Sequence, residues 1–211
     1  SYEILIVDDA STDNTIEKIE KFKKNNPNID IKIFCNEKNR GIGYNLWATA
    51  HKALGKYYFI LMGDGGTPIN EIRKIVNNIG KADMILSYFI DKRPVFRRTL
   101  SKIFVIVINL ITSNNIKYYN NCNIYLLENV KLYGTGASGY GYQAELITVL
   151  MRLKKTFIEV KVENTISEWG TTKAFRLRNL FSVGRSLIVI FLSQIGYVVK
   201  KILKKFRIFK S

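Results

Sequence analysis

Carboxylates stand directly behind two apolar runs of this chain. Residues 4–7 are followed by Asp8 and Asp9, and residues 57–62 are followed by Gly63 and Asp64. Short apolar runs that alternate with helical patterns predict parallel strands, and open α/β sheets bind ligands outside the carboxyl ends of their strands. Carboxylates at that edge can accept hydrogen bonds from a nucleobase or hold a divalent metal ion against a diphosphate, because Mg²⁺ and Mn²⁺ prefer oxygen ligands. A sugar nucleotide offers both groups.

Strand-like and helix-like patterns alternate through the first ninety residues. Residues 10–14 are rich in helix-capping residues, and Ile16, Ile19 and Phe22 follow them at helical spacing. The patterns after this helix predict a strand at 29–34, a helix from 41 to about 54, a strand at 56–62 and a helix from 68 to about 78. This order predicts an α/β fold with a mostly parallel sheet flanked by helices.

The second half of the sequence is less regular. We predict strands or extended segments at 84–89, 118–127 and 157–162, and helices at 95–112 and 142–153. Residues 103–116 and 186–199 are each fourteen uncharged residues long. A helix needs about 20 residues to cross a bilayer, so both segments fit core or interfacial helices better than spans. Extending the second one back to Leu180 leaves a transmembrane interpretation open.

The charge of the chain favours a polyanionic partner. There are 33 Lys and Arg against 17 Asp and Glu, a formal net charge of +16, and residues 92–127 and 179–211 carry basic residues but no acidic one. Both stretches contain long apolar runs, which suits an anionic membrane surface better than nucleic acid.

A single His and two Cys exclude a metal framework built on those residues. No secretory signal opens the sequence, so we expect a peripheral location on the cytosolic face of the membrane, with one C-terminal membrane helix as the alternative.

Residues 2–13, Tyr-Glu-Ile-Leu-Ile-Val-Asp-Asp-Ala-Ser-Thr-Asp, resemble the nucleotide-binding opening of family 2 glycosyltransferases. These enzymes have the GT-A fold, and the resemblance extends to the polyprenyl-phosphate and dolichyl-phosphate sugar transferases. The similarity continues in order through Asn39-x-Gly41-x-Gly43, Gly55-Lys56-Tyr57, Met62-Gly63-Asp64, Gly141-Tyr142-x-x-Glu145-Leu146 and Gly170-Thr171-Thr172-Lys173. It implies a GT-A-like, Rossmann-like domain over residues 1–178, followed at 179–211 by a basic, amphipathic, membrane-associating helical segment.

The chain departs from the family pattern in two ways. Family members begin with an extra strand and helix, including a Pro-x-x-Asn-Glu stretch, and this sequence starts after that point. We therefore expect an N-terminally incomplete domain. The usual Asp-x-Asp metal motif is reduced to Met62-Gly63-Asp64, which keeps only the second carboxylate and implies a metal affinity that depends more on the diphosphate.

The resemblance implies a role for several residues around the donor. Asp64 should coordinate Mg²⁺ or Mn²⁺, which acts as a Lewis acid on the leaving group. The implied donor-binding residues are Asp8, Asp9, Ser11, Asp13, Asn39, Arg40, Gly43 and Asp64. Simpler interpretations remain open: helix caps for Asp9 and Asn39, and a turn carboxylate for Asp64.

On the acceptor side, the resemblance implies that Glu145 is the catalytic base. A sugar hydroxyl must lose its proton as it attacks, whereas a prenyl phosphate is already ionised and needs no base. Lys173, Arg176 and Arg178 follow the Gly-Thr-Thr turn and could bind an acceptor phosphate or a lipid headgroup. A solvent-facing helix residue and a solvated basic face are the alternatives.

The leading hypothesis is an inverting, metal-dependent glycosyltransferase of polysaccharide or glycolipid biosynthesis. It would move a sugar from a UDP- or GDP-sugar to a polyprenyl phosphate or glycan acceptor at the cytosolic membrane face. The alternative is a catalytically inactive, membrane-associated scaffold with the same fold. A basic RNA-binding protein is a third and weaker hypothesis, and no nucleic-acid partner is expected.

Overall fold

The computed structural model describes residues 1–89, 95–163 and 177–208, with side chains described except at 177–180 and 203–208. At its N-terminal end, strand β1 (Ile4–Asp8) pairs in parallel with β2 (Ile31–Cys35), and helix α1 (Thr15–Asn25) connects them. The register sets Ile4 opposite Ile31 and Asp8 opposite Cys35. This strand, helix and strand unit is the one that the apolar spacing predicts.

A second sheet has four strands in the order β3 (Tyr57–Phe59), β5 (Ile124–Leu126), β4 (Met84–Phe89) and β6 (Phe157–Val162). β4 and β6 are parallel, but β5 runs antiparallel to both of its neighbours. The sheet is therefore mixed, where the sequence predicts a mostly parallel one. Side chains alternate with a period of two residues in either strand direction, so the apolar pattern of β5 does not encode its orientation.

Four shorter helices surround this sheet: α2 (Ile42–Ala50), α3 (Ile69–Val76), α5 (Leu127–Tyr133) and α6 (Tyr142–Arg152). The main core holds fully buried residues from the sheet and from α6, among them Met84, Leu86, Tyr125, Leu146 and Leu150. The extended segment predicted at 118–127 is a strand only at 124–126, and α5 begins directly after it.

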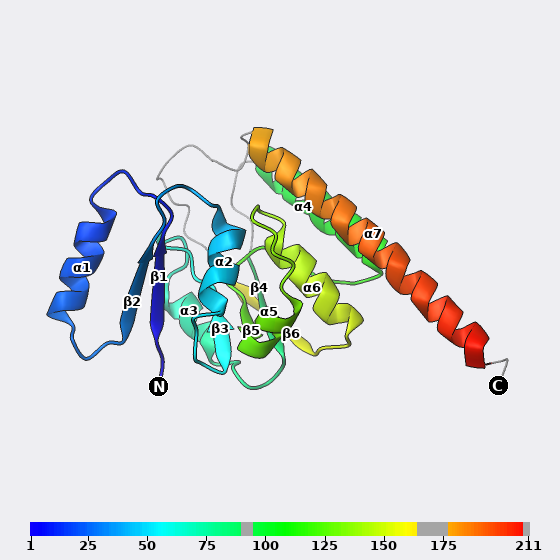
Figure 1. Ribbon diagram of the computed structural model, residues 1–211, viewed down its shortest axis with the longest axis horizontal. Coiled ribbons are helices and arrows are strands. Elements are labelled where there is room, and N and C mark those ends of the chain that lie inside the picture. Colours follow the sequence, from blue (N-terminus) through cyan, green and yellow to red (C-terminus); the bar gives the residue numbers. More distant parts are fainter. Residues whose placement is uncertain (90–94, 164–176, 209–211) are drawn as a thin grey trace.

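The longest helices lie together on the far side of the molecule from α1. Helix α4 (Val95–Thr112) and helix α7 (Leu177–Ile208) pack side by side, and the C-terminal part of α7 extends beyond the rest of the molecule (Figure 1). Within the described residues, one stretch meets the length and apolarity of a bilayer-crossing helix: Phe181–Ile202 of α7, with a mean hydropathy of 1.6.

Candidate functional site

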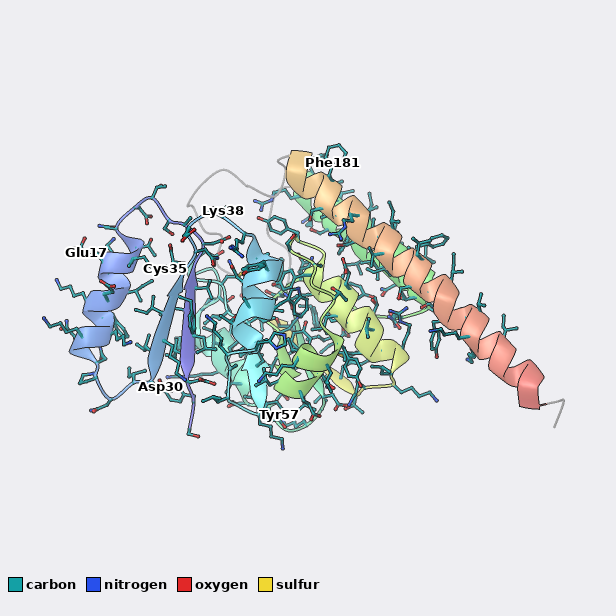
Figure 2. The ribbon with its side chains drawn as sticks, in the orientation of Figure 1. Glu17, Asp30, Cys35, Lys38, Tyr57 and Phe181 are labelled. Atoms are coloured by element: carbon teal, nitrogen blue, oxygen red, sulfur yellow. The ribbon has the colours of Figure 1, made fainter. Side chains whose placement is uncertain are left out.

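The candidate site begins where β1 and β2 end. Figure 2 shows Asp30, at the start of β2, and Cys35, at the end of that strand, on opposite sides of the molecule. β1 is parallel to β2, so Asp9, which follows β1, lies on the side of Cys35. Asp64 follows β3, which belongs to the other sheet.

Asp9 organises the loop that leads into α2. Its Oδ1 accepts hydrogen bonds from the backbone N–H of Arg40 (2.8 Å) and from Nδ2 of Asn36 (2.9 Å), and its Oδ2 accepts one from the backbone N–H of Gly41 (2.9 Å). Nδ2 of Asn36 also donates to Oδ1 of Asn45 at 2.7 Å. An ionised carboxylate can accept about four hydrogen bonds, so Oδ2 retains capacity for one donor from a ligand.

These contacts keep Asp9 ionised. Burial raises the pKa of its carboxyl, but the hydrogen bonds from Arg40, Asn36 and Gly41 outweigh burial and hold the pKa below its ordinary value. The next residue, Ala10, has a φ of 62°, a conformation that costs a residue with a Cβ roughly 1–3 kcal/mol. Such positions cluster at functional sites, and here the turn directs the chain away from β1 immediately after the carboxylate.

The other acidic residues of the opening motif hold the local backbone. Asp8 is buried, and its Oδ2 accepts the backbone N–H of Ser11 at 3.0 Å. Asp13 is exposed, and its Oδ1 accepts the backbone N–H and the hydroxyl of Thr15, the first residue of α1. The structure thus places Asp8, Ser11 and Asp13 in the turn between β1 and α1.

Asn39 and Arg40 are exposed at the start of α2. Nδ2 of Asn39 lies 3.4 Å from the backbone oxygen of Asp9, so its side chain reaches back to the end of β1. Asn39 does not cap α2, because the N-cap position is Gly41 and has no side-chain hydrogen bond. The Arg40 guanidinium donates to the hydroxyl of Tyr44 (2.6 Å) and lies 4.7 Å from the centre of its ring.

Gly41 and Gly43 allow a glycine-rich loop, residues 134–141, to pack on the start of α2. The Gly43 N–H donates to the backbone oxygen of Ser138 (3.1 Å), and a Cβ on Gly43 would collide with the backbone oxygen of Ala137. Gly41 has a φ of 89°. Nε1 of Trp47 donates to that same Ala137 oxygen at 2.9 Å. Sequence analysis missed this contact, for which the density of glycine at 134–141 was the available signal.

Asp64 lies in an exposed glycine turn after β3. Its Oδ1 accepts the backbone N–H of Gly66 at 2.9 Å, and Oδ2 makes no hydrogen bond within the described part of the chain. Among the described residues no group of three or more His, Cys, Asp or Glu could hold a metal ion. Mg²⁺ and Mn²⁺ are commonly bound by one or two carboxylates together with substrate phosphates, and a lone exposed carboxylate fits that mode of binding.

Glu145 occupies a position that its sequence context does not predict. It is 5% exposed, and its Oε1 accepts a hydrogen bond from the hydroxyl of Ser186 in α7 at 2.5 Å. The alternative interpretation of Glu145 as a solvent-facing residue is therefore wrong. Cβ atoms on Gly139 and Gly141 would collide with Ser182 and Ser186, so the same glycine-rich loop also packs against α7.

A buried polar network connects β4, β5 and α6 and was also missed by the sequence analysis. Oε1 of Gln143 accepts hydrogen bonds from Asn123 and from the hydroxyl of Tyr125, each at 2.7 Å, while Oδ1 of Asn123 accepts the backbone N–H of Ser87. Burial raises the pKa of Tyr125, so this hydroxyl stays protonated and donates. Gln143 lies inside the Gly141 to Glu145 motif, which gave no indication of its partners.

The predicted acceptor-side residues are only partly covered. Lys173 and Arg176 lie outside the described residues, and Arg178 lies in the first turn of α7 with its side chain outside them. The predicted division after residue 178 falls just inside α7, which begins at Leu177. These assignments stay predictions. The prediction that Asp9 and Asp64 line one pocket also stays a prediction.

Comparison with known proteins identifies relatives of the chain. The sequence model described as Glycosyl transferase family 2 matches residues 1–143. The chain is 31% identical over 137 residues to the processive diacylglycerol beta-glycosyltransferase of Mycoplasma genitalium, covering 61% of this chain and 38% of that protein. It is 29% identical over 107 residues to the dolichyl-phosphate beta-glucosyltransferase of Dictyostelium discoideum, covering 47% and 33%. The chain thus spans between 33% and 38% of the length of these relatives.

Solved structures show the same fold. Glucosyl-3-phosphoglycerate synthase from Mycobacterium tuberculosis, in complex with Mn²⁺, UDP-glucose and phosphoglyceric acid, superposes with a TM-score of 0.63 at 16% identity, covering 91% of this chain and 68% of that one. Its complex with Mn²⁺, UDP and phosphoglyceric acid gives 0.64 at 17% identity, covering 92% and 68%. The predicted GT-A-like α/β fold is confirmed.

Proposed function

The chain belongs to glycosyl transferase family 2, and on this premise we propose that it transfers a sugar from a nucleotide donor to a lipid-linked acceptor at the cytosolic face of a membrane. The observation that carries the proposal is the position of Asp9. Its carboxylate follows β1, fixes the start of α2 through Arg40 and Gly41, and keeps one acceptor position on Oδ2. That arrangement suits an N–H or hydroxyl group of a UDP- or GDP-linked donor.

The proposed donor site extends from Asp9 towards Asp64. Mg²⁺ or Mn²⁺, when bound, would stabilise the negative charge of the departing diphosphate, and Asp64 would hold the ion. Support comes from the exposure of Asp64 and from its Oδ2, which makes no hydrogen bond among the described residues. Further support comes from a protein of the same fold that was solved in complex with Mn²⁺ and UDP-glucose. Arg40 is exposed at the start of α2 and supplies a positive charge on the same side.

The proposed reaction is a direct displacement with inversion. An acceptor oxygen bonds to the anomeric carbon as the bond from that carbon to the diphosphate breaks and the nucleoside diphosphate leaves. A phosphate acceptor is already ionised, whereas a sugar hydroxyl must give up a proton. The Glu145 carboxylate is buried and engaged by Ser186, which favours an acceptor that needs no base, such as a polyprenyl phosphate.

The lipid acceptor and the membrane location have further support. The two curated relatives carry diacylglycerol and dolichyl phosphate in their names, and α7 contains a long apolar stretch. In this proposal, residues 1–178 form the transferase domain, residues 179–211 associate with the membrane, and Lys173, Arg176 and Arg178 bind the acceptor phosphate.

A transfer assay tests the proposal. The purified chain is incubated with labelled UDP- and GDP-sugars, Mn²⁺ or Mg²⁺, and either polyprenyl phosphate or diacylglycerol in detergent. We expect labelled lipid with at least one donor and loss of product in Asp9→Ala. Normal product is expected in Asp30→Asn, because Asp30 is an exposed carboxylate at the start of the parallel β1–β2 pair and Asp9 follows its end. If no donor gives either transfer or thermal stabilisation of the protein, the proposal is contradicted.

A catalytically inactive scaffold is the second candidate. The single carboxylate of the Asp64 turn favours it, because a family metal site with one carboxylate has fewer fixed ligands. The same assay separates the two: stabilisation by a nucleotide sugar without hydrolysis or transfer would favour the scaffold.

A further inference from the structure

Two neighbouring helices expose apolar stripes. On α7, six of the exposed apolar residues recur three, four or seven positions apart, which places them on one face of the helix. Outside this spacing, the helix also exposes Val189, Phe191, Tyr197 and Val198. The stripe comprises Phe181, Ile188, Leu192, Ile195, Val199 and Ile202. On α4, which packs beside α7, Ile103, Ile106 and Leu110 form a second stripe with the same spacing, and Leu110 is 76% exposed.

The exposed charges on these helices are positive. Lys102 on α4 and Arg185, Lys200 and Lys201 on α7 are exposed. The sequences of both helices contain no Asp or Glu. Apolar stripes with cations beside them complement an anionic lipid surface, because the apolar side chains enter the acyl boundary while the cations remain among the headgroups.

The first half of α7 is fixed to the body of the protein. Ser186 and Ile190 are buried, the Ser186 hydroxyl donates to Glu145, and the Arg152 guanidinium donates to the hydroxyl of Ser193 at 2.6 Å. The Ser182 hydroxyl oxygen accepts the backbone N–H of Tyr140. A helix that crossed a bilayer along its apolar stretch would have to break these contacts and leave the Glu145 carboxylate buried without its partner.

The second half of α7 carries lysines that oppose its insertion into a bilayer. Lys200 and Lys201 are exposed within this part and would be drawn into the hydrocarbon core if the helix crossed the bilayer. The attachment of the first half and the charges of the second both oppose a spanning orientation.

We propose that α4 and α7 together form one docking surface that lies in the plane of an anionic lipid leaflet, without crossing it. This docking surface deepens the membrane part of the proposed function. Only its biological purpose rests on that function, since lipid binding requires neither a sugar donor nor catalysis. The α4 stripe is the new element, because the apolar stretch of α7 by itself does not imply that a second helix contacts lipid.

Vesicle flotation tests the surface without any sugar nucleotide. Wild-type protein is mixed with phosphatidylcholine vesicles, or with vesicles that also contain phosphatidylglycerol, at low and high salt. We expect binding only to the anionic vesicles and release at high salt. Leu110→Asp on α4 and Leu192→Asp on α7 should each weaken binding at least tenfold, and Arg185→Gln about fivefold. Leu132→Asp, on the exposed face of α5, is the matched control and should bind normally.

Several outcomes would overturn the proposal. Normal binding by Leu110→Asp would remove α4 from the surface, and resistance of bound protein to high salt and alkaline carbonate would indicate a spanning helix. Sedimentation velocity without lipid provides a further check: a wild-type dimer that Leu110→Asp converts to monomer would assign the stripes to a second copy of the chain. Vesicle binding without any transfer activity would leave this inference standing and would count against the proposed function alone.

Discussion

The Ser186 hydroxyl of α7 donates a hydrogen bond to the buried carboxylate of Glu145 in α6, with 2.5 Å between the two oxygens. The contact joins residues 41 positions apart and fixes the long C-terminal helix to the helix that follows the glycine-rich loop. Gly141 lies directly beneath it, because a Cβ there would collide with Ser186. The pair thus gives Glu145 a structural role whatever part it plays in catalysis.

Substitution of Ser186 or Glu145 separates the structural role of the Glu145 carboxylate from a catalytic one. Ser186→Ala leaves a buried carboxylate without its hydroxyl donor, and we expect a loss of roughly 1–3 kcal/mol in the free energy of unfolding. Glu145→Gln keeps an acceptor oxygen for Ser186 and should cost less stability. If Glu145 also acts as a base, Glu145→Gln lowers transfer to a sugar hydroxyl by about 10²–10⁴-fold. Urea denaturation and transfer assays with a hydroxyl and a phosphate acceptor measure the two effects.

Met151→Leu, a volume-conserving change on the same helix, serves as the control for general disturbance of α6. Wild-type stability of Ser186→Ala would contradict the structural role. An equal loss of transfer with both acceptors in a folded Glu145→Gln protein would contradict the assignment of a base that only the hydroxyl acceptor needs.

Local signals predicted the first part of the site, and long-range contacts account for what sequence analysis missed. The apolar run that ends at Asp8 and the cap residues before Thr15 are both local, and β1 and α1 form where these signals indicate. The partners of Asp9 come from residues 27 to 32 positions away, and no local pattern records which backbone N–H groups a carboxylate will meet. The direction of β5 was missed for the same reason, because strand pairing is a property of two segments.

Substitution of Asp9 should loosen the start of α2. Asp9→Ala removes the acceptor of three hydrogen bonds at the 36–41 loop, and we expect a loss of roughly 1–3 kcal/mol at neutral pH. Asp9→Asn retains one carbonyl oxygen and should lose less. Urea denaturation at pH 7 measures both losses, with Asp30→Asn as the exposed-carboxylate control. A neutral Asp9→Ala would contradict the organising role.

The contribution of Asp9 should also depend on pH in a defined direction. Its folded-state pKa lies below the ordinary value of 3.8, so the native state favours the ionised form. The stabilisation is therefore fully present above about pH 5 and is lost as the pH falls through the folded-state pKa. The difference in unfolding free energy between wild type and Asp9→Asn should shrink between pH 5 and pH 3. A difference that grows on acidification would contradict the assigned shift.

Substitution of Asp64 should affect metal-dependent donor binding and leave the fold intact. The side chain is exposed, so Asp64→Asn should change the unfolding free energy by no more than about 0.5 kcal/mol. Loss of a ligand should raise the Mn²⁺ concentration needed for stabilisation by UDP- or GDP-sugar at least about tenfold, and EDTA should abolish that stabilisation in wild type. Thermal-shift titration of Mn²⁺ at fixed donor measures this. Equal donor binding in EDTA and in Mn²⁺ would contradict a metal held at this turn.

Gly43→Ala tests the contact between α2 and the glycine-rich loop. The added methyl group would meet the Ala137 oxygen, so the loop must move, and we expect a loss of roughly 1–3 kcal/mol in unfolding free energy. The hydrogen bond from Trp47 to that oxygen should lengthen, which shifts the Trp47 emission in a background carrying Trp169→Phe. The control is Gly184→Ala on α7, where a Cβ meets nothing within 4 Å and alanine should gain roughly 0.5–1 kcal/mol of helix stability. Unchanged stability and emission in Gly43→Ala would show that the loop does not pack against α2 in solution.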